Sequence, residues 1–163
     1  MPMTSDLIET ASRLLNELRA QGMTLGTAES CTGGLISACL TEVPGSSDVF
    51  ERGFVTYSNA AKAEMLGVPE ELIEAHGAVS QEVAVAMTEG ALAHSPADLA
   101  VAVTGIAGPD GGSEDKPVGL VFIAAARREG AATHLRCTFG DIGRSEVRER
   151  TAAEAFRMVR SLL

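Results

Sequence analysis

The sequence predicts one α/β domain over residues 1–163, a three-layer α/β/α fold with a mixed sheet. Its composition is 45% hydrophobic and 21% charged over 163 residues, which suits one compact domain with a sizeable core. Segments with helical periodicity also alternate along the chain with short apolar or alternating runs that are typical of strands. No repeat, low-complexity segment or interdomain linker interrupts this order.

The chain is predicted to begin with a helix, a strand and a second helix. Apolar residues recur at helical spacing over 7–18, and Gly22 follows as the residue just past the helix end. The run 23–28 predicts a short buried strand, which breaks into ESCTGG before an apolar helix over 35–40.

Two further helices are predicted after a second strand. The run 50–57 is rich in β-forming residues. Asn59 can cap a short helix that carries Lys62 and stops near Gly67. Ser80 is a cap for the next helix, which Pro96 closes.

The last third of the chain predicts three strands and a closing helix. The continuous apolar run 99–103 is typical of a central strand that is covered on both faces. Segments 118–126 and 133–139 are predicted to form a hairpin near one edge of the sheet, joined by the polar RREG. From Ser145 onward, apolar residues form one helical stripe.

Charge and composition exclude several kinds of protein. A net charge of −9 without a basic run opposes nucleic acid, so any phosphate must be held by a local site. No apolar run reaches the roughly 18 to 20 residues of a membrane span, and the acidic N-terminus is unlike a secretion signal. We therefore expect a cytoplasmic protein.

Cysteine and histidine spacing predicts neither disulfides nor a metal site. Cys31, Cys39 and Cys137 include no CxxC pair and leave an odd thiol. The three histidines are isolated from one another and from any ligand at metal spacing. We expect reduced thiols and no metal or redox cofactor, while the sequence leaves homo-oligomerisation open.

Ser30 is the first candidate for chemistry. It follows a predicted strand and precedes Gly33 and Gly34, where free N–H groups at a helix start could bind an oxyanion. The alternative is that Ser30 or Thr32 merely caps the helix. Cys31 is the adjacent rival nucleophile, or a small packed side chain. The surrounding AESCT lacks the GxSxG pattern of α/β-hydrolases.

Lys62 is the candidate base, and Tyr57 lies close to it in TYSNAAK. A catalytic lysine must be a neutral amine, which burial or a nearby cation would favour. Alone, Lys62 could equally be a solvated surface lysine, and Tyr57 could relay a proton or simply pack. The chain lacks a Ser-x-x-Lys spacing, so a serine and lysine pair would have to assemble through the fold.

A glycine-rich loop and an arginine complete the candidates. The loop TGIAGPDGG begins at Thr104 and Gly105 and lets a backbone approach a ligand, but it matches neither the P-loop nor the dinucleotide motif. A flexible turn explains it equally well. Arg144 could reach a phosphate or carboxylate with its planar fork. Arg148 and Arg150 are interpreted as solvated charges of the last helix.

Several long blocks together resemble the CinA C-terminal domain family: TAESCTGG, TYSNAAK, HGAVSQEVA, VTGIAGPDGG with KPVGLVFIA, and GRSEVRERTA. They occur in the family's order and cover nearly all of the chain from Thr24 onward. The resemblance implies a nicotinamide-nucleotide amidase that converts nicotinamide mononucleotide and water to nicotinate mononucleotide and ammonia, within pyridine nucleotide recycling.

The resemblance also implies roles for individual residues. Ser30 matches the family's nucleophile, Lys62 its base and Tyr57 the accompanying tyrosine. The implied substrate contacts are Cys31, Thr32, Gly33, Gly34, Thr104, Gly105 and Arg144. Two alternatives remain at this stage: a regulatory module that binds pyridine nucleotides without turnover, and an amidase for another small amide.

Overall fold

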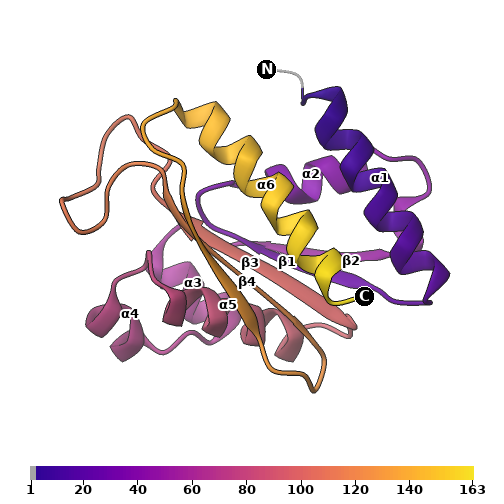
Figure 1. Ribbon diagram of the computed structural model, residues 1–163. Helices are drawn as coiled ribbons and strands as arrows, with labels where there is room; N and C mark the ends of the chain where they lie inside the picture. The colour runs from indigo at the N-terminus through magenta and orange to yellow at the C-terminus, as the bar shows by residue number, and fades with distance from the viewer. Residues whose placement is uncertain (1–2) are drawn as a thin grey trace.

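The computed structural model describes residues 3–163 and shows a five-stranded mixed sheet between two helical layers (Figure 1). The strands are β1 (Leu25–Glu29), β2 (Phe50–Val55), β3 (Leu99–Gly105), β4 (Leu120–Arg127) and β5 (Thr133–Thr138). The helices are α1 (Ser5–Ala20), α2 (Leu35–Thr41), α3 (Asn59–Leu66), α4 (Glu70–His76), α5 (Gln81–Ala93) and α6 (Arg144–Ser161). The predicted three-layer α/β/α fold is confirmed.

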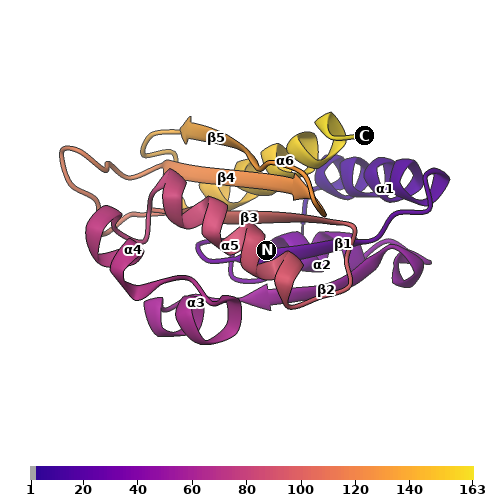
Figure 2. The ribbon, with the colours of Figure 1, turned by 90° about the horizontal axis from the view of Figure 1, so that it is seen from below.

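The sheet order β2-β1-β3-β4-β5 places the parallel strands on one side and the predicted hairpin on the other (Figure 2). β1 pairs in parallel with both β2 and β3, whereas β4 runs antiparallel to β3 and β5. The carboxyl ends of β1, β2 and β3 therefore meet at one edge of the sheet. Ligands of open α/β sheets usually bind at this edge.

Each face of the sheet has its own core. Helices α1, α2 and α6 cover one face, and α3, α4 and α5 cover the other (Figure 1). Every residue of β1, and β3 from Leu99 to Thr104, is buried. Burial on both faces explains why β3 is a continuous apolar run from Leu99 to Val103, whereas β1 also buries the polar Thr27 and Glu29.

Two helical details differ from the sequence prediction. The Asn59 cap is wrong, because the Ser58 side chain accepts the hydrogen bond from the Ala61 N–H at 3.0 Å. Helix α4 was not predicted at all. It is one short element between Pro69 and Gly77, and Ile73 is the residue it buries, so it has little apolar periodicity. The Ser80 cap of α5 is confirmed.

Helix α3 lies against α5 at a residue without a side chain. A Cβ atom added to Gly90 would lie 2.1 Å from the backbone oxygen of Leu66. Any larger residue would force the two helices apart. The close approach therefore fixes where α3 stands relative to the sheet edge.

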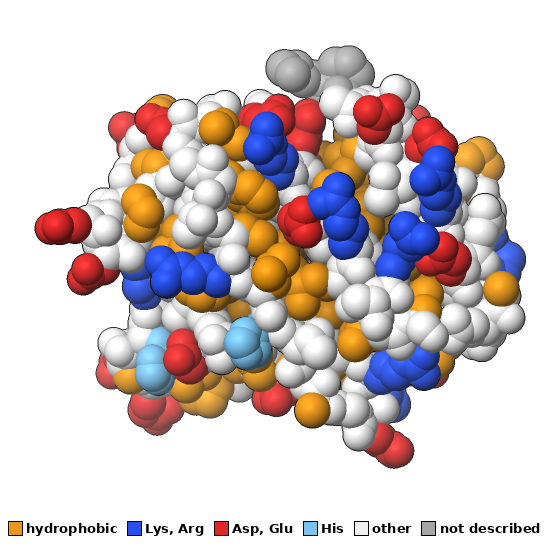
Figure 3. Space-filling model, in the orientation of Figure 1, with side chains coloured by type: hydrophobic (Ala, Val, Ile, Leu, Met, Phe, Trp, Pro, Cys, Tyr) orange, Lys and Arg blue, Asp and Glu red, His pale blue; other side chains and the backbone are white. Residues whose placement is uncertain are grey.

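The surface that α1 and α6 form carries both positive and negative side chains. Basic and acidic side chains are interspersed there in the space-filling view (Figure 3). Several form ion pairs, among them Arg160 with Glu17 and Arg19 with Asp48. Within residues 3–163, no helix is both long and apolar enough to cross a membrane.

Candidate active site at the carboxyl edge of the parallel strands

Ser30 and Lys62 meet at the carboxyl edge of the sheet. Ser30 directly follows β1, and Lys62 projects from α3, the helix after β2. The Lys62 Nζ atom lies 3.1 Å from the Ser30 Oγ atom, within hydrogen-bond distance. The Lys62 side chain is 1% exposed and Ser30 is 7% exposed. The surface interpretation of Lys62 is therefore wrong.

The surroundings of Lys62 lower its pKa. Its Nζ also donates to the carbonyl oxygens of Thr56 at 3.0 Å and Tyr57 at 3.3 Å. These two acceptors require N–H bonds, so the third position on the nitrogen faces the Ser30 hydroxyl. No carboxylate pairs with Lys62 in the described residues, and burial lowers its pKa. A neutral Lys62 would present its lone pair to Ser30.

A tight turn presents Ser30. The Gly33 N–H donates to the Ser30 carbonyl oxygen at 3.0 Å, which closes the turn. Gly33 and Gly34 both have positive φ angles, of 57° and 104°, a region that glycine adopts without strain. Gly34 is the N-cap of α2 and has no side chain to cap it, and neither the Ser30 nor the Thr32 hydroxyl accepts a hydrogen bond from the α2 amides. The interpretation of Ser30 or Thr32 as a helix cap is therefore wrong.

Glu29 occupies the helix start that the sequence suggested for an oxyanion. Its carboxylate is fully buried and accepts hydrogen bonds from the N–H groups of Ile36 at 2.8 Å and Ser37 at 3.0 Å, and from the Ser37 hydroxyl at 2.8 Å. The α2 amides are therefore not free. In the part of the chain described, the N–H groups of Thr32 and Gly34 form no hydrogen bond, so donors for an oxyanion remain in the turn itself.

Replacing Glu29 with glutamine is expected to lower the free energy of unfolding by about 1–3 kcal/mol, because the new NH₂ group would face backbone N–H donors in a buried site. Urea unfolding measures this change. Glu42→Gln is the matched control, since Glu42 is exposed at the other end of α2, and we expect a change within about 0.5 kcal/mol. Equal stabilities of the two variants would contradict the role of Glu29.

A hollow of about 380 Å³ opens beside the turn that carries Ser30, and its lining includes neither Ser30 nor Lys62. Its lining comes from the Ser30 turn, the end of β2 and the start of α6: Cys31, Gly33, Val55, Tyr57, Arg144 and Arg148. The volume lies within the range of small-molecule sites. Val55 and Tyr57 give it an apolar wall, and the two arginines give it a cationic one.

Arg144 bridges the mouth of this hollow, whereas Arg148 is not the solvated charge that the sequence suggested. Arg144 donates to the carbonyl oxygen of Gly108 at 2.8 Å and to the Tyr57 hydroxyl at 3.0 Å. Arg148 is half-buried and donates to the Thr32 carbonyl oxygen at 2.7 Å. Its spacing of four residues from Arg144 places both on one face of α6, a signal that was present in the sequence.

Three further predicted site residues make contacts with other parts of the protein. The Tyr57 hydroxyl contacts Arg144, so only its backbone carbonyl reaches Lys62. The Thr104 hydroxyl is 1% exposed and donates to the Ala78 carbonyl oxygen at 2.8 Å. Gly105 lets β3 pass close to β4, because a Cβ there would lie 2.6 Å from a Val121 methyl group.

Cys31 borders the hollow, but its thiol is poorly suited to attack. Burial raises the pKa of the Cys31 thiol to about 12. Since the thiolate is the nucleophilic form, little of it exists near neutral pH. Ser30, which contacts a buried amine, is the better-placed nucleophile.

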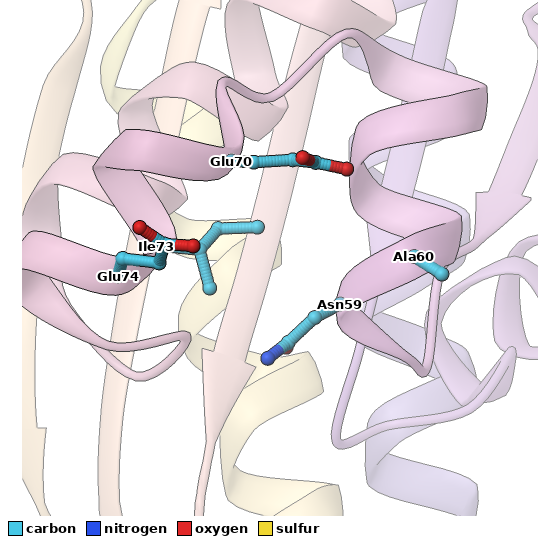
Figure 4. Close-up of a pocket in the computed structure, with 5 residues that line it drawn as sticks. All are labelled: Asn59, Ala60, Glu70, Ile73 and Glu74. Carbon is cyan, nitrogen blue, oxygen red and sulfur yellow. The ribbon is translucent and has the colours of Figure 1, made fainter.

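A second hollow, of about 270 Å³, lies between α3 and α4. Figure 4 shows Asn59 and Ala60 on α3 opposite Glu70, Ile73 and Glu74 on α4. This lining has two carboxylates but no nucleophile, so it does not suit acyl transfer. Across residues 3–163, no three His, Cys, Asp or Glu side chains gather closely enough to hold a metal ion.

The fold and the site define an α/β protein with a serine and a buried lysine in contact at the carboxyl edge of its parallel strands. The CinA C-terminal domain matches residues 8–163, and the chain belongs to this family. The nicotinamide-nucleotide amidohydrolase PncC of Escherichia coli K12 is 51% identical over 154 residues, which cover 94% of this chain and 92% of that protein.

Longer relatives contain the same region. A competence-damage inducible protein of Symbiobacterium thermophilum is 55% identical over 96% of this chain, which corresponds to 38% of that protein. Among solved structures, competence/damage inducible protein CihA from Agrobacterium tumefaciens superposes with a TM-score of 0.96 at 50% identity, covering 99% of this chain and 98% of that one. The family resemblance expected from the sequence is confirmed.

Proposed function

We propose that this chain is a nicotinamide-nucleotide amidase that hydrolyses nicotinamide mononucleotide to nicotinate mononucleotide and ammonia. The observation that carries the proposal is the 3.1 Å contact between the Ser30 hydroxyl and the buried Lys62 amine. The name of the E. coli relative, which matches almost end to end, supports the substrate. We further propose that residues 1–163 act as one domain in cytoplasmic pyridine nucleotide recycling.

In the first half of the proposed reaction, Lys62 takes the proton of the Ser30 hydroxyl as Oγ attacks the carboxamide carbon. The negative charge on the carbonyl oxygen would be held by backbone N–H groups of the turn, where those of Thr32 and Gly34 have no other partner among the described residues. A preorganised donor of this kind contributes about 3–4 kcal/mol in hydrolases. The C–N bond then breaks, and Lys62 returns the proton to the leaving nitrogen as ammonia forms.

The second half of the reaction releases the acid. Water enters the hollow, Lys62 accepts one of its protons, and the hydroxide attacks the Ser30 ester. Collapse of this intermediate breaks the ester bond, and the Lys62 proton returns to Ser30 Oγ. Nicotinate mononucleotide leaves as the carboxylate. In this scheme Tyr57 forms a wall of the hollow and supplies a carbonyl acceptor to Lys62.

The test is ammonia release measured by a coupled assay with nicotinamide mononucleotide, nicotinamide and the dinucleotide as separate substrates. Rapid release from the mononucleotide alone supports the proposal. Release from simple amides in preference would favour an amidase of another specificity. Tight binding of the mononucleotide without any ammonia would favour a regulatory module.

The pH dependence is expected to follow the Lys62 amine. The base is active when neutral, so kcat/KM should rise with pH and level off above the Lys62 pKa. Since burial lowers that pKa, the midpoint should lie below the ordinary value of about 10.4. A profile of kcat/KM against pH measures this midpoint in the wild type, and Cys31→Ala should show the same rise with pH. Loss of this rise in the Cys31 variant would assign the titration to the thiol.

A further inference from the structure

The arginines of α6 divide into two groups. Three of them pair with carboxylates: Arg150, Arg157 and Arg160. Arg144 and Arg148 form no ion pair with any residue from 3 to 163, and both line the hollow beside Ser30. The two cations without a counter-ion are therefore the two that face the candidate site.

The two arginines differ in how far their guanidinium groups are already occupied. Both terminal nitrogens of Arg144 bond to protein oxygens, one on Gly108 and one on Tyr57. Arg148 uses only Nη2, which donates to Thr32. Its Nε and Nη1 groups form no hydrogen bond within the described chain. Arg148 thus keeps the donors that a ligand would need, while Arg144 is held by the loops around the mouth.

The lining of the hollow contains no carboxylate to neutralise these cations. The chain as a whole has a net charge of −9, so its long-range field repels anions. An anionic group can therefore be favoured here only by short-range contacts. A guanidinium suits such contacts with a phosphate, because its planar fork can donate two directed hydrogen bonds.

We propose that Arg148 is a specificity-determining residue that binds the 5′-phosphate of the substrate through its free N–H groups. This inference rests on the proposed amidase function and extends it to the choice between phosphorylated and unphosphorylated nicotinamide ribosides. One guanidinium arm of Arg148 stays on the Thr32 carbonyl oxygen, next to the turn that carries Ser30. The phosphate is thereby anchored at a fixed distance from the nucleophile.

The test compares kcat/KM for nicotinamide mononucleotide with that for nicotinamide riboside in wild type, Arg148→Gln, Arg148→Lys and Arg150→Gln. Arg148→Gln should lower the mononucleotide-to-riboside ratio by about 10- to 100-fold, mainly through KM, because a charged hydrogen bond is lost. Arg148→Lys should recover only part of the ratio. Arg150→Gln, which removes an exposed cation paired with Glu146, should keep it.

The mononucleotide-to-riboside ratio of kcat/KM distinguishes two roles for Arg148: binding of the phosphate, and support of the Ser30 turn through Thr32. If Arg148 only holds Thr32, Arg148→Gln lowers turnover of both substrates alike and the ratio stays constant, which overturns the proposal. Should the wild type release no ammonia, the amidase proposal fails by itself, and calorimetric titration with the mononucleotide and the riboside then tests Arg148 directly. Selective weakening of mononucleotide binding in Arg148→Gln supports the inference, and equal affinities of the variant and wild type overturn it.

Discussion

Ser30→Ala is expected to reduce ammonia release from nicotinamide mononucleotide by at least about 10³-fold, the scale seen when a hydrolase loses its nucleophile. The variant has no atom at the position that contacts Lys62 Nζ, so no acyl intermediate can form. The backbone of the turn stays closed, because its hydrogen bonds come from main-chain groups. Substrate binding should therefore survive.

Two measurements make this prediction decisive: single-turnover ammonia release, and calorimetric binding of the mononucleotide. Cys31→Ala is the matched control, since it alters the neighbouring buried side chain and should be much milder. Near-normal turnover in Ser30→Ala would remove Ser30 from the mechanism. Collapse of the Cys31 variant with an active Ser30→Ala would transfer the role to the thiol.

Lys62→Met is expected to slow the chemical step by about 10²- to 10⁴-fold, the usual contribution of a general acid and base. Methionine preserves much of the aliphatic volume but cannot accept or return a proton. Lys62→Arg should also fail, because a guanidinium stays protonated. Rescue by arginine would show that positive charge, rather than base function, is what the site requires.

The control for Lys62 is Lys116→Met, which removes the other lysine of the sequence. Lys116 lies in the loop between β3 and β4 and donates to the His76 carbonyl oxygen, not to Ser30. Single-turnover rates should fall only in the Lys62 variant. Equal loss in both would point to a general effect of removing positive charge.

The lowered pKa of Lys62 should also make the free energy of unfolding depend on pH. Burial lowers its pKa, so between the folded and unfolded pKa values the folded state binds fewer protons at this site. The free energy of unfolding contributed by Lys62 therefore rises with pH across that interval. Denaturant unfolding at several pH values should show this slope in wild type and its loss in Lys62→Met.

Most of the fold could be predicted from the residues because the parallel strands and long helices have strong hydrophobic patterns. The run 99–103 indicated a buried central strand, and the stripe after Ser145 indicated the closing helix, as found in β3 and α6. Helix α4 could not be predicted from hydrophobic periodicity, because it is seven residues long and buries only Ile73. Short helices of this kind are defined by what they pack against rather than by periodicity.

The candidate site was harder to predict from the residues alone than the fold was. Ser30 and Lys62 are separated by 32 positions, so only the family resemblance joined them before the fold was known. The role of Glu29 could not be read from AESCT, since it depends on the direction in which α2 leaves the turn. Arg148 differs from Arg150 in lying four residues after Arg144, on the same face of α6, but that face could be assigned to the hollow only once the packing of α6 was known.

The close contact between α3 and α5 at Gly90 has a consequence for how this protein tolerates change. Lys62 is carried by a two-turn helix whose depth is set by a backbone contact, without any hydrogen bond between Gly90 and Lys62. The position of the Lys62 Nζ atom thus depends on Gly90. Every substitution at Gly90 adds a side chain where there is no room for one. Under the proposed mechanism, substitutions that change how α3 packs on α5 would therefore also change the distance between Lys62 and Ser30.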